Sequence, residues 1–504
     1  MTPELDATAV GPLVAVSVGA MVVLLGEVFL SRAGTFLGRK VTAAYIGSVL
    51  AAVSMLFLGI AAYMAIAHAA GGETRVFNPG HPMFRLDPFS SLMTALIVIA
   101  ALLSCALSIA FLSELRINHG EYYALVLFST AGMLLMVCAV DLLTVFVGLE
   151  LMSIPLYVLA GFDRGKLRSN ESALKYFLMG SFASAILLYG MALLYGASGG
   201  TSLATIRAGF DPASPLALVG LGLVIVGFAF KISSVPFHQW TPDVYEGAPA
   251  AVTAFMSVTV KLAAFATLLR VLALGFDPLG DVLGNLLWVL AALTMIVGNV
   301  MALIQDNIKR LLAYSSIAHA GYLLIGFVPG NEAGYSAVVF YLICYLFMNL
   351  GAFAVVVALA HRGQECERME SLAGLSRSRP ALAAVMALFM ISLAGIPGTA
   401  GFMGKLMIFS AAVGAGEIGL AILGVLMSVV SVYYYLRIPV LMYMREPGDE
   451  APRQELASGE ALVLGVCALG VLYLGLSPNG SLPILGDLHV LDWARESVAL
   501  LFAG

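Results

Sequence analysis

Five ionisable side chains stand alone within long apolar stretches of this chain. They are Glu150, Lys175, Lys231, Lys261 and Lys405. Burying one charge at the centre of a bilayer costs on the order of 3 kcal/mol or more, so membrane helices carry such groups rarely and mainly for function. Groups that gain and lose protons at membrane depth are typical of a proton or ion pathway.

Two of these groups lie in consecutive apolar stretches and are expected to interact. Glu150 lies within DLLTVFVGLELMSIPLYVLAGF, and Lys175 lies near the start of ESALKYFLMGSFASAILLYG. At about 4 Å and an effective dielectric constant of about 20, their attraction would be roughly 4 kcal/mol. That is enough to decide whether a lysine in a low-dielectric site keeps its proton. We therefore expect a switchable Glu150–Lys175 pair; the alternative is a static ion pair that orients the helices.

Lys231 begins the densest polar motif of the chain, KISSVPFHQWTPDVYEGAP. Pro236 has no backbone N–H, so it should break the helix and free carbonyl groups that can hold water beside the lysine. The imidazole of His238 titrates near neutral pH, which makes it a candidate proton relay.

The same motif continues with two carboxylates and a tryptophan. Asp243 and Glu246 follow where the chain should meet the membrane surface. They could feed protons inward, although carboxylates at a surface are usually only solvated. Trp240 is expected to anchor the membrane interface.

Lys261 lies in the middle of AVTAFMSVTVKLAAFATLLR. Ser257 and Thr259 are close enough in sequence to be its hydroxyl partners. The position is deep within the stretch, so we expect a proton relay; the alternative is that the side chain snorkels to the surface.

His319 and Lys405 extend the series into the second half of the chain. His319 follows Ser315 and Ser316 by four and three residues, which places the three on one helix face. It is either a relay or a hydrogen-bonded core histidine. Lys405 follows GIPGTAGFMG, where Pro397 and the glycines should open the helix, and it is expected to end the second pathway.

Composition excludes the ordinary soluble classes. The 504 residues are 61% hydrophobic and 11% charged, with a mean hydropathy of +0.98. A spanning helix needs about 20 apolar residues, so the chain has room for about 14 spans. The apolar runs are too long for barrel strands of about 10 alternating residues. The predicted fold is an all-α polytopic membrane protein.

The distribution of basic residues predicts the topology. With 14 spans, most of the 25 lysines and arginines gather on one side, which the positive-inside rule makes the cytoplasm. Both termini would then be periplasmic. The few basic residues expected on the outer side are Arg75, Arg85, Arg207, Arg270 and Arg495.

A repeat is visible in the order of these features. The five spans within 120–276 can be laid over the five within 277–446, and in each block the fourth span is broken, at SSVP (233–236) or at AGIPG (394–398). Because five is odd, the second block would be inverted, as in many transporters whose ion site lies at broken helices near the midplane. The predicted parts are thus an N-terminal three-helix segment (1–119), the two repeats, and a C-terminal helix and tail (447–504).

No redox centre is expected on this chain. The five cysteines are scattered without a CxxC pair, so no iron–sulfur or zinc ligand set is visible. No glycine-rich phosphate loop follows an expected strand, and nothing indicates nucleic-acid binding. Redox chemistry would have to take place on other chains.

Several of these motifs together resemble a known family. DLLTVFVGLELMSIPLYVLAGF, ESALKYFLMGSFAS, FKISSVPFHQWTPDVYEGAP, NIKRLLAYSSIAHAGY and GIPGTAGFMGK resemble subunit N of bacterial NADH-quinone oxidoreductase, respiratory complex I. The resemblance covers roughly residues 120–445. Lysine at position 405 fits subunit N, since some antiporter-like relatives carry glutamate there.

The resemblance implies a function and partners. It implies a proton-translocating subunit in the membrane arm of complex I, in the bacterial inner membrane, with key groups at Glu150, Lys175, Lys231, Lys261 and Lys405. Protonation of Lys231, controlled by Glu150 and Lys175, would pass protons through Lys261 and His319 to Lys405. NADH, FMN, iron–sulfur clusters and quinone would be bound by partner subunits of a hetero-oligomer.

Three other functions remain open on the sequence. A subunit of a multisubunit Na⁺/H⁺ antiporter or of a membrane-bound hydrogenase would share the same core. A solute permease would need a substrate-sized polar cavity, whereas this chain offers a line of single titratable groups. A structural scaffold gives no reason to bury four lysines.

Overall fold

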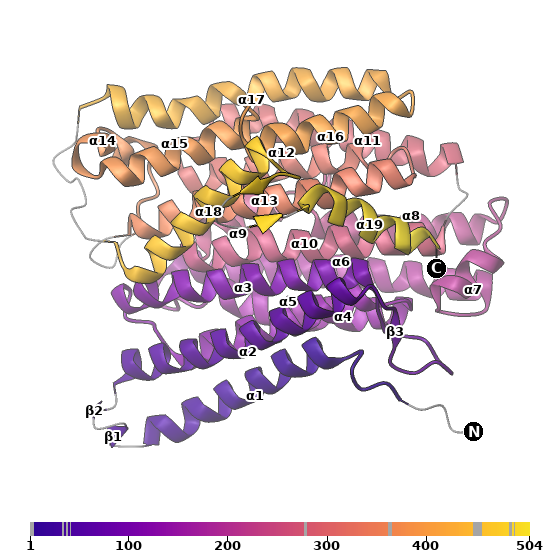
Figure 1. The fold of residues 1–504 in the computed structure, drawn as a ribbon, viewed down its shortest axis with the longest axis horizontal. Helices are drawn as coiled ribbons and strands as arrows, with labels where there is room; N and C mark the ends of the chain where they lie inside the picture. Colours follow the sequence, from indigo (N-terminus) through magenta and orange to yellow (C-terminus); the bar gives the residue numbers. More distant parts are fainter. Residues whose placement is uncertain are drawn as a thin grey trace. The chain divides into compact units, whose positions relative to one another are not determined.

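A computed structural model describes residues 5–32, 35–36, 39–40, 42–276, 280–360, 365–446, 456–482, 486–487 and 489–503. These residues are mostly helical (Figure 1). The chain divides into two compact units: unit 1 comprises residues 1–232, 247–279 and 500–504, and unit 2 comprises residues 233–246 and 280–499.

Unit 1 is built from the helices of the first half of the chain. They are α1 (Gly11–Arg32), α2 (Ala43–Gly71), α3 (Pro88–Glu114), α4 (Gly120–Cys138), α5 (Leu142–Ala160), α6 (Leu167–Ser198), α7 (Leu203–Gly209), α8 (Pro215–Lys231) and α10 (Ala250–Gly275). Figure 1 shows α1, α2 and α3 side by side, and α2 packs against both of the others. The helix α5 packs on α4 and α6, and α8 packs on α6.

Unit 2 holds the helices of the second half together with α9 (Trp240–Gly247) except its last residue. The others are α11 (Gly280–Leu303), α12 (Ile308–Ile325), α13 (Glu332–Ala358), the 3₁₀ helix η1 (Met369–Leu372), α14 (Leu375–Ser378), α15 (Pro380–Ala394), α16 (Ala400–Gly414), α17 (Ile418–Met444), α18 (Ser458–Leu476) and α19 (Val490–Ala503). Most of α19 belongs to this unit, and its last turn is assigned to unit 1.

Among the described residues, strands form three short antiparallel hairpins. The pairs are β1 (Thr35–Phe36) with β2 (Arg39–Lys40), β3 (Arg75–Val76) with β4 (Arg85–Leu86), and β5 (Ser481–Leu482) with β6 (Gly486–Asp487). Each strand has two residues, so the hairpins tie down connections and do not add a sheet layer.

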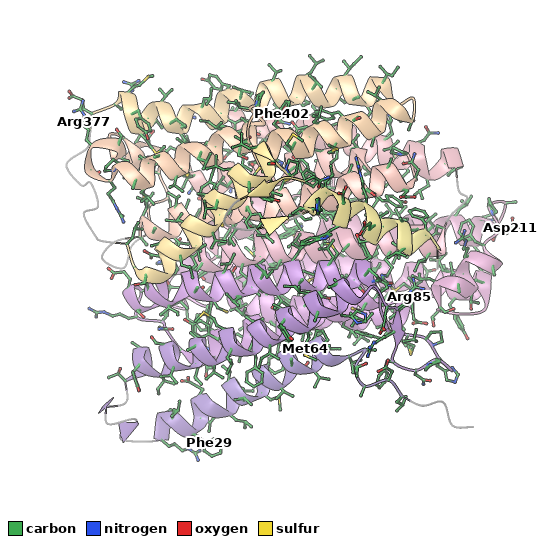
Figure 2. All side chains as sticks on the ribbon, viewed as in Figure 1. Phe29, Met64, Arg85, Asp211, Arg377 and Phe402 are labelled. Carbon is green, nitrogen blue, oxygen red and sulfur yellow. The ribbon has the colours of Figure 1, made fainter. Side chains whose placement is uncertain are left out.

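The predicted all-α membrane class is confirmed. Within the described residues, eleven helices are long and apolar enough to cross a membrane, and α8, α15 and α16 are shorter apolar helices. Large apolar side chains on these helices face outward: Phe29 on α1 is 69% exposed and projects away from the helices (Figure 2). The protein is therefore a multi-pass membrane protein. The inverted repeats and the four predicted parts stay predictions, and the expected boundaries at 277 and 447 lie outside the described residues.

Small residues allow a close helix contact in unit 1, between α4 and α5. A Cβ atom on Gly132 would lie 2.2 Å from the backbone nitrogen of Met152, and one on Gly148 would lie 2.8 Å from that of Met136. Glycine at both positions lets the two backbones approach, which is how membrane helices gain packing contacts. This contact positions α5, which carries Glu150.

Glu27, which the sequence left without a role, has a clear place in unit 1. Its Oε2 atom accepts a hydrogen bond of 2.9 Å from the backbone N–H of Gly120, the first residue of α4. The N-cap residue His119 makes no side-chain capping bond. A carboxylate from α1 thus satisfies a free N–H group at the positive end of the α4 dipole.

Arg270, which the sequence predicts on the outer side of the membrane, is a buried residue of unit 1. Its side chain is fully buried in α10, and its Nη2 donates a 2.6 Å hydrogen bond to Oδ1 of Asp87, the N-cap of α3. Burial alone would raise the pKa of the Asp87 carboxyl, but the charge and hydrogen bond of Arg270 outweigh burial and lower that pKa. Asp87 also pairs with Arg85 at 3.1 Å.

This buried pair predicts a large loss of stability when one charge is removed. Asp87→Asn keeps a capping oxygen for α3 but leaves Arg270 buried without its counter-ion, and breaking a buried pair in this way costs about 3–5 kcal/mol. We expect a lower unfolding temperature of the purified protein in detergent. Glu73→Gln is the control, because Glu73 pairs with Arg75 at the surface and exposed pairs contribute about 0–1 kcal/mol. Equal unfolding temperatures for the two variants would contradict the prediction.

Candidate functional site

Lys231 is the last residue of α8 and is 2% exposed. Its Nζ donates a 2.7 Å hydrogen bond to Oγ of Ser153 on α5, and Ser153 is fully buried. A hydroxyl oxygen is therefore the polar partner that the structure gives to this buried amine. Such a contact offsets part of the cost of moving an ammonium group out of water.

Aromatic rings surround the same lysine. The Nζ atom lies 5.6 Å from the ring centre of Tyr157, 5.8 Å from that of Tyr176 and 5.7 Å from that of Phe230. The negative faces of aromatic rings attract a cation at these distances. The rings therefore favour the charged form of Lys231. A carboxylate in direct contact would hold the proton more strongly than the rings do.

The expected Glu150–Lys175 ion pair is not the one found in this structure. The Nζ of Lys175 lies 2.8 Å from Oε1 of Glu171, four residues earlier on α6, and the two side chains are 42% and 56% exposed. Oε1 of Glu150 is buried and has no hydrogen-bond partner among the described residues. Glu150 is instead within electrostatic reach of Lys231 and Tyr157. A glutamate four residues before a lysine lies on the same helix face and forms an ion pair with it. In this structure the ammonium group of Lys175 is therefore bound to Glu171.

The expected break after Lys231 is present. Helix α8 ends at Lys231 and α9 begins at Trp240. Within unit 2, Ser233 has a positive φ of 64° and accepts a 2.7 Å hydrogen bond from Thr241, and Oγ of Ser234 lies 2.8 Å from Oγ1 of Thr294. Side-chain hydroxyls thus hold this irregular stretch, as non-helical backbone within a membrane protein requires.

His238 lies in this stretch and is half-buried. Its Nδ1 atom is buried and without a hydrogen-bond partner in the part of the chain that the structure describes. A relay role for His238 stays a prediction.

The residues that follow His238 differ from expectation. Trp240 is 3% exposed and its ring meets that of Tyr245, so it is a core residue and the predicted interfacial anchor is wrong. Asp243 and Glu246 are not merely solvated, because each carboxylate lies 2.9 Å from Nη1 of Arg310 at the start of α12. The ion pairs join α9 to α12 within unit 2.

Lys261 is 1% exposed at the middle of α10. Snorkelling to the surface is therefore excluded as the reason for this lysine. The hydroxyls of Ser257 and Thr259 donate to carbonyls of their own helix, at Ala254 (3.1 Å) and Phe255 (2.8 Å). The relay role stays a prediction that burial of a titratable group supports.

His319 lies at the centre of a cluster of buried tyrosines in unit 2. Its Nδ1 is 2.6 Å from the hydroxyl of Tyr341 on α13, and its Nε2 is 3.1 Å from that of Tyr435 on α17. The two serines on its own face bond elsewhere: Ser315 to Tyr435, and Ser316 to Tyr345. Both ring nitrogens thus meet hydroxyl groups, which can donate or accept as the imidazole changes its protonation.

Lys405 lies on α16, and its ammonium group caps the C-terminus of α15. Its Nζ donates to the carbonyls of Leu393 (3.2 Å) and Ala394 (2.9 Å), the last two residues of α15, and to Oγ of Ser428 (2.8 Å) on α17. Carbonyl groups at a helix C-terminus have no partner within the helix and form the negative end of its dipole, so they attract a cation. The second expected helix break, between Ala394 and Ala400, thus forms the binding place of this lysine.

A tyrosine connects the surroundings of His319 and Lys405. The ring of Tyr322 lies 4.8 Å from Nζ of Lys405 and 5.8 Å from the imidazole of His319, centre to centre. Its hydroxyl accepts a 3.2 Å hydrogen bond from Asn299, whose oxygen accepts one of 3.0 Å from Tyr434. Tyr322, Asn299 and Tyr434 were not among the predicted site residues; the signal that could have indicated them is the recurrence of polar and phenolic residues within otherwise apolar spans.

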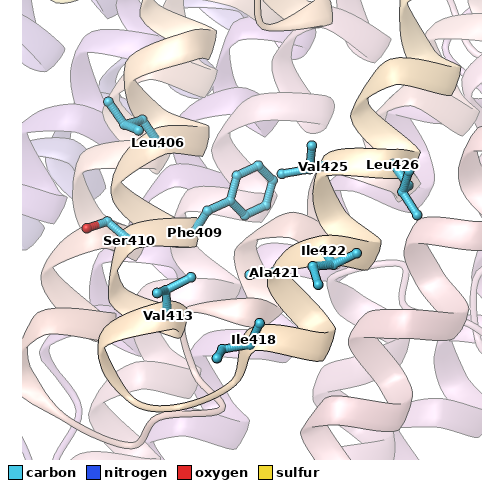
Figure 3. A pocket seen from close by; sticks show the side chains of 9 residues that line it. All are labelled: Leu406, Phe409, Ser410, Val413, Ile418, Ala421, Ile422, Val425 and Leu426. Atoms are coloured by element: carbon cyan, nitrogen blue, oxygen red, sulfur yellow. The ribbon is translucent and has the colours of Figure 1, made fainter.

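The apolar hollow beside this cluster is not a proton path. It has a volume of about 470 Å³ and lies between α16 and α17 (Figure 3). Its lining is aliphatic apart from Phe409 and the hydroxyl of Ser410, and Ile422 in it is 56% exposed. Phe409, which lines the hollow, also meets the ring of Tyr322. No titratable side chain lines this hollow.

Comparison with known sequences gives one consistent result. The family model described as NADH:quinone oxidoreductase/Mrp antiporter, TM, matches residues 139–431, which include Glu150, Lys175, Lys231, Lys261 and Lys405. NADH-quinone oxidoreductase subunit N of Trichlorobacter lovleyi is 49% identical over 420 residues, or 82% of this chain and 84% of that protein. Subunit N of Myxococcus xanthus is 43% identical and covers 95% of this chain and 96% of its own length.

Solved structures show the same fold. A chain of respiratory complex I from Thermus thermophilus aligns with a TM-score of 0.75 and 36% identity, covering 91% of this chain and 97% of that one. A chain of the Mrp complex from Dietzia sp. aligns with a TM-score of 0.83 over 98% of this chain and 97% of its own, at 23% identity. The second likeness concerns the fold alone.

Proposed function

Because this chain belongs to the subunit N family of NADH-quinone oxidoreductases, we propose that it is a proton-translocating subunit in the membrane arm of such an enzyme. Electron transfer from NADH to quinone takes place on partner subunits, which carry the FMN and iron–sulfur clusters. The observation that best supports proton movement through this chain is its pair of buried lysines, each beside the end of a short apolar helix and each bonded to a hydroxyl.

In unit 1, Lys231 is the group that changes protonation. Its ammonium form is held by Ser153 and the faces of Tyr157 and Tyr176, and the nearby Glu150 strengthens that form when ionised. A change in the charge of Glu150 therefore alters how readily Lys231 releases its proton. Lys175, paired here with Glu171, would join this control when that local pair opens.

In unit 2, Lys405 and His319 play the corresponding roles. The carbonyl end of α15 favours a charged Lys405, and His319 exchanges protons with the hydroxyls of Tyr341 and Tyr435. The sequence predicts transfer from Lys261 to His319 and then to Lys405 and the outer face.

The proposed setting follows from the same family. The chain would be one subunit of a hetero-oligomer in a bacterial inner membrane, with both termini in the periplasm. Within the described residues no group of three or more His, Cys, Asp and Glu side chains could hold a metal ion. A subunit of a multisubunit Na⁺/H⁺ antiporter is the second candidate, because that class shares this fold.

A tagged copy of this chain, extracted in mild detergent from its own bacterium, tests the proposal. We expect a large assembly that oxidises NADH with a quinone acceptor and acidifies the lumen of proteoliposomes as it does so. The control is the same purification from cells with an untagged chain.

The alternative result is equally definite. Co-purification of membrane subunits without NADH oxidation, together with sodium-dependent proton exchange in vesicles, would contradict the complex I assignment and favour the antiporter.

A further inference from the structure

Ser153 has a hydrogen-bond arrangement that suits a role beyond holding the ammonium group of Lys231. Its hydroxyl donates to the carbonyl of Leu149, one turn earlier on α5, and accepts from Nζ of Lys231 at 2.7 Å. A serine hydroxyl has one proton to donate and two lone pairs to accept with. The proton is directed to Leu149, so the lone pairs are left for the lysine. This is the arrangement that suits a protonated Lys231.

Glu150 lies three residues before Ser153, on the same face of α5. One of its carboxylate oxygens, Oε1, is buried and has no hydrogen-bond partner among the residues that the structure describes. A buried carboxylate oxygen without a hydrogen-bond partner is costly, so a donor group that reaches it would be favoured there. The hydroxyl of Ser153 is thus next to a lysine on one side and one turn from a carboxylate on the other.

We propose that Ser153 is the hydroxyl relay through which Lys231 exchanges its proton with Glu150. This inference rests on the proposed function, because it concerns the same proton movement. When Lys231 has lost its proton, its neutral amine has a lone pair, and the Ser153 hydroxyl turns from the Leu149 carbonyl toward it. The Oγ–H bond breaks as the N–H bond forms. Oγ takes a proton from protonated Glu150, directly or through one water, and leaves Glu150 as a carboxylate.

The reverse movement returns one proton from Lys231 to Glu150, so atoms and charges balance in both directions. No oxidant or reductant is needed. The backbone hydrogen bonding of α5 is interrupted in the same stretch. Pro155 has no N–H group, so the carbonyl of Leu151 lacks its usual helical hydrogen bond. Ser129 of α4 donates a 3.0 Å hydrogen bond to the neighbouring carbonyl of Met152 and so holds this part of α5 in place.

The test compares Ser153→Ala, Ser153→Thr and Ser129→Ala in the whole purified assembly, reconstituted in proteoliposomes. Protons pumped per NADH oxidised are measured with a pH-sensitive dye. Ser153→Ala is expected to lower this ratio about tenfold, less than the 10²–10⁴ typical of a lost acid–base group, because water fills the space. Ser153→Thr keeps the hydroxyl and should restore at least about half of the pumping. Ser129→Ala removes another buried serine hydroxyl that bonds α5, and should pump as wild type.

Lys231→Ala is measured in the same assay. It distinguishes a failure of the Ser153 relay from a failure of the proposed function. If Lys231→Ala fails to pump while Ser153→Ala pumps fully, the relay is wrong and the proposed function stands. If both pump fully, the proposed function itself fails. Equal losses in Ser153→Ala and Ser129→Ala would show a structural effect and overturn the relay. If Ser153→Thr does not assemble, the comparison of the two alanine variants decides alone.

Discussion

Lys231→Ala is expected to abolish NADH-driven proton pumping while the assembly stays largely intact. The side chain is the sole titratable group on α8 and is enclosed by Ser153 and three aromatic rings. Losing a proton-transfer group lowers a rate by about 10²–10⁴, so almost no pumping should remain. NADH oxidation in detergent and acidification in proteoliposomes are measured on the same preparation.

Lys231→Arg distinguishes the effect of the positive charge from the effect of proton release. Arginine keeps a positive charge among the same aromatic rings but does not deprotonate in proteins. We expect this variant to assemble and to pump as poorly as Lys231→Ala. Lys166→Ala is the matched control, because Lys166 is a 43% exposed lysine that pairs with Asp163 at the surface. Pumping at the wild-type level in either Lys231 variant would exclude Lys231 as the group that moves protons.

The fold class and the two main lysines could be predicted because each leaves a local signal. A single lysine in an apolar stretch is visible without any tertiary structure, and so are Pro236 and the glycines around Pro397, which end helices wherever they occur. The structure confirms that helices end at Lys231 and at Ala394. Burial of Lys261 followed from its depth in the stretch in the same way.

The partners of these lysines could not be predicted, because they come from helices far apart in sequence. Ser153 precedes Lys231 by 78 residues, and Ser428 follows Lys405 by 23. Tyrosines such as Tyr341 and Tyr435 occur in apolar spans for many reasons, and nothing local shows that both meet His319. Tertiary packing alone selects these contacts.

Two residues, Lys175 and Trp240, differ from expectation for physical reasons that the sequence partly contained. Glu171 stands four residues before Lys175, a spacing that forms a pair on one helix face, and it competes with Glu150. Trp240 follows a helix break, and the chain direction changes there so that the indole ring is buried in the core.

Lys405→Met is the second variant for which we expect nearly complete loss of pumping. Methionine has a similar length and apolar volume, so the packing of α16 changes little. The carbonyls of Leu393 and Ala394 and the hydroxyl of Ser428 lose their cationic partner, and unit 2 loses the proton acceptor on α16. The measurement is the same ratio of protons pumped to NADH oxidised. Full pumping by this variant would contradict the role of Lys405.

The position of Lys405, and not its charge alone, is tested by Gly395→Ala. Gly395 has a φ of +85°, and a Cβ atom there would lie 2.9 Å from Cδ and 3.1 Å from Nζ of Lys405. The added methyl group therefore pushes the ammonium from the end of α15, and pumping should fall several-fold. Gly416→Ala is the matched control, since Gly416 has a φ of +87° and a Cβ there meets nothing within 4 Å. Both variants bear the same backbone cost of about 1–2 kcal/mol. A difference between them in pumping would then come from the contact with Lys405, whereas equal losses would show that backbone strain alone is responsible.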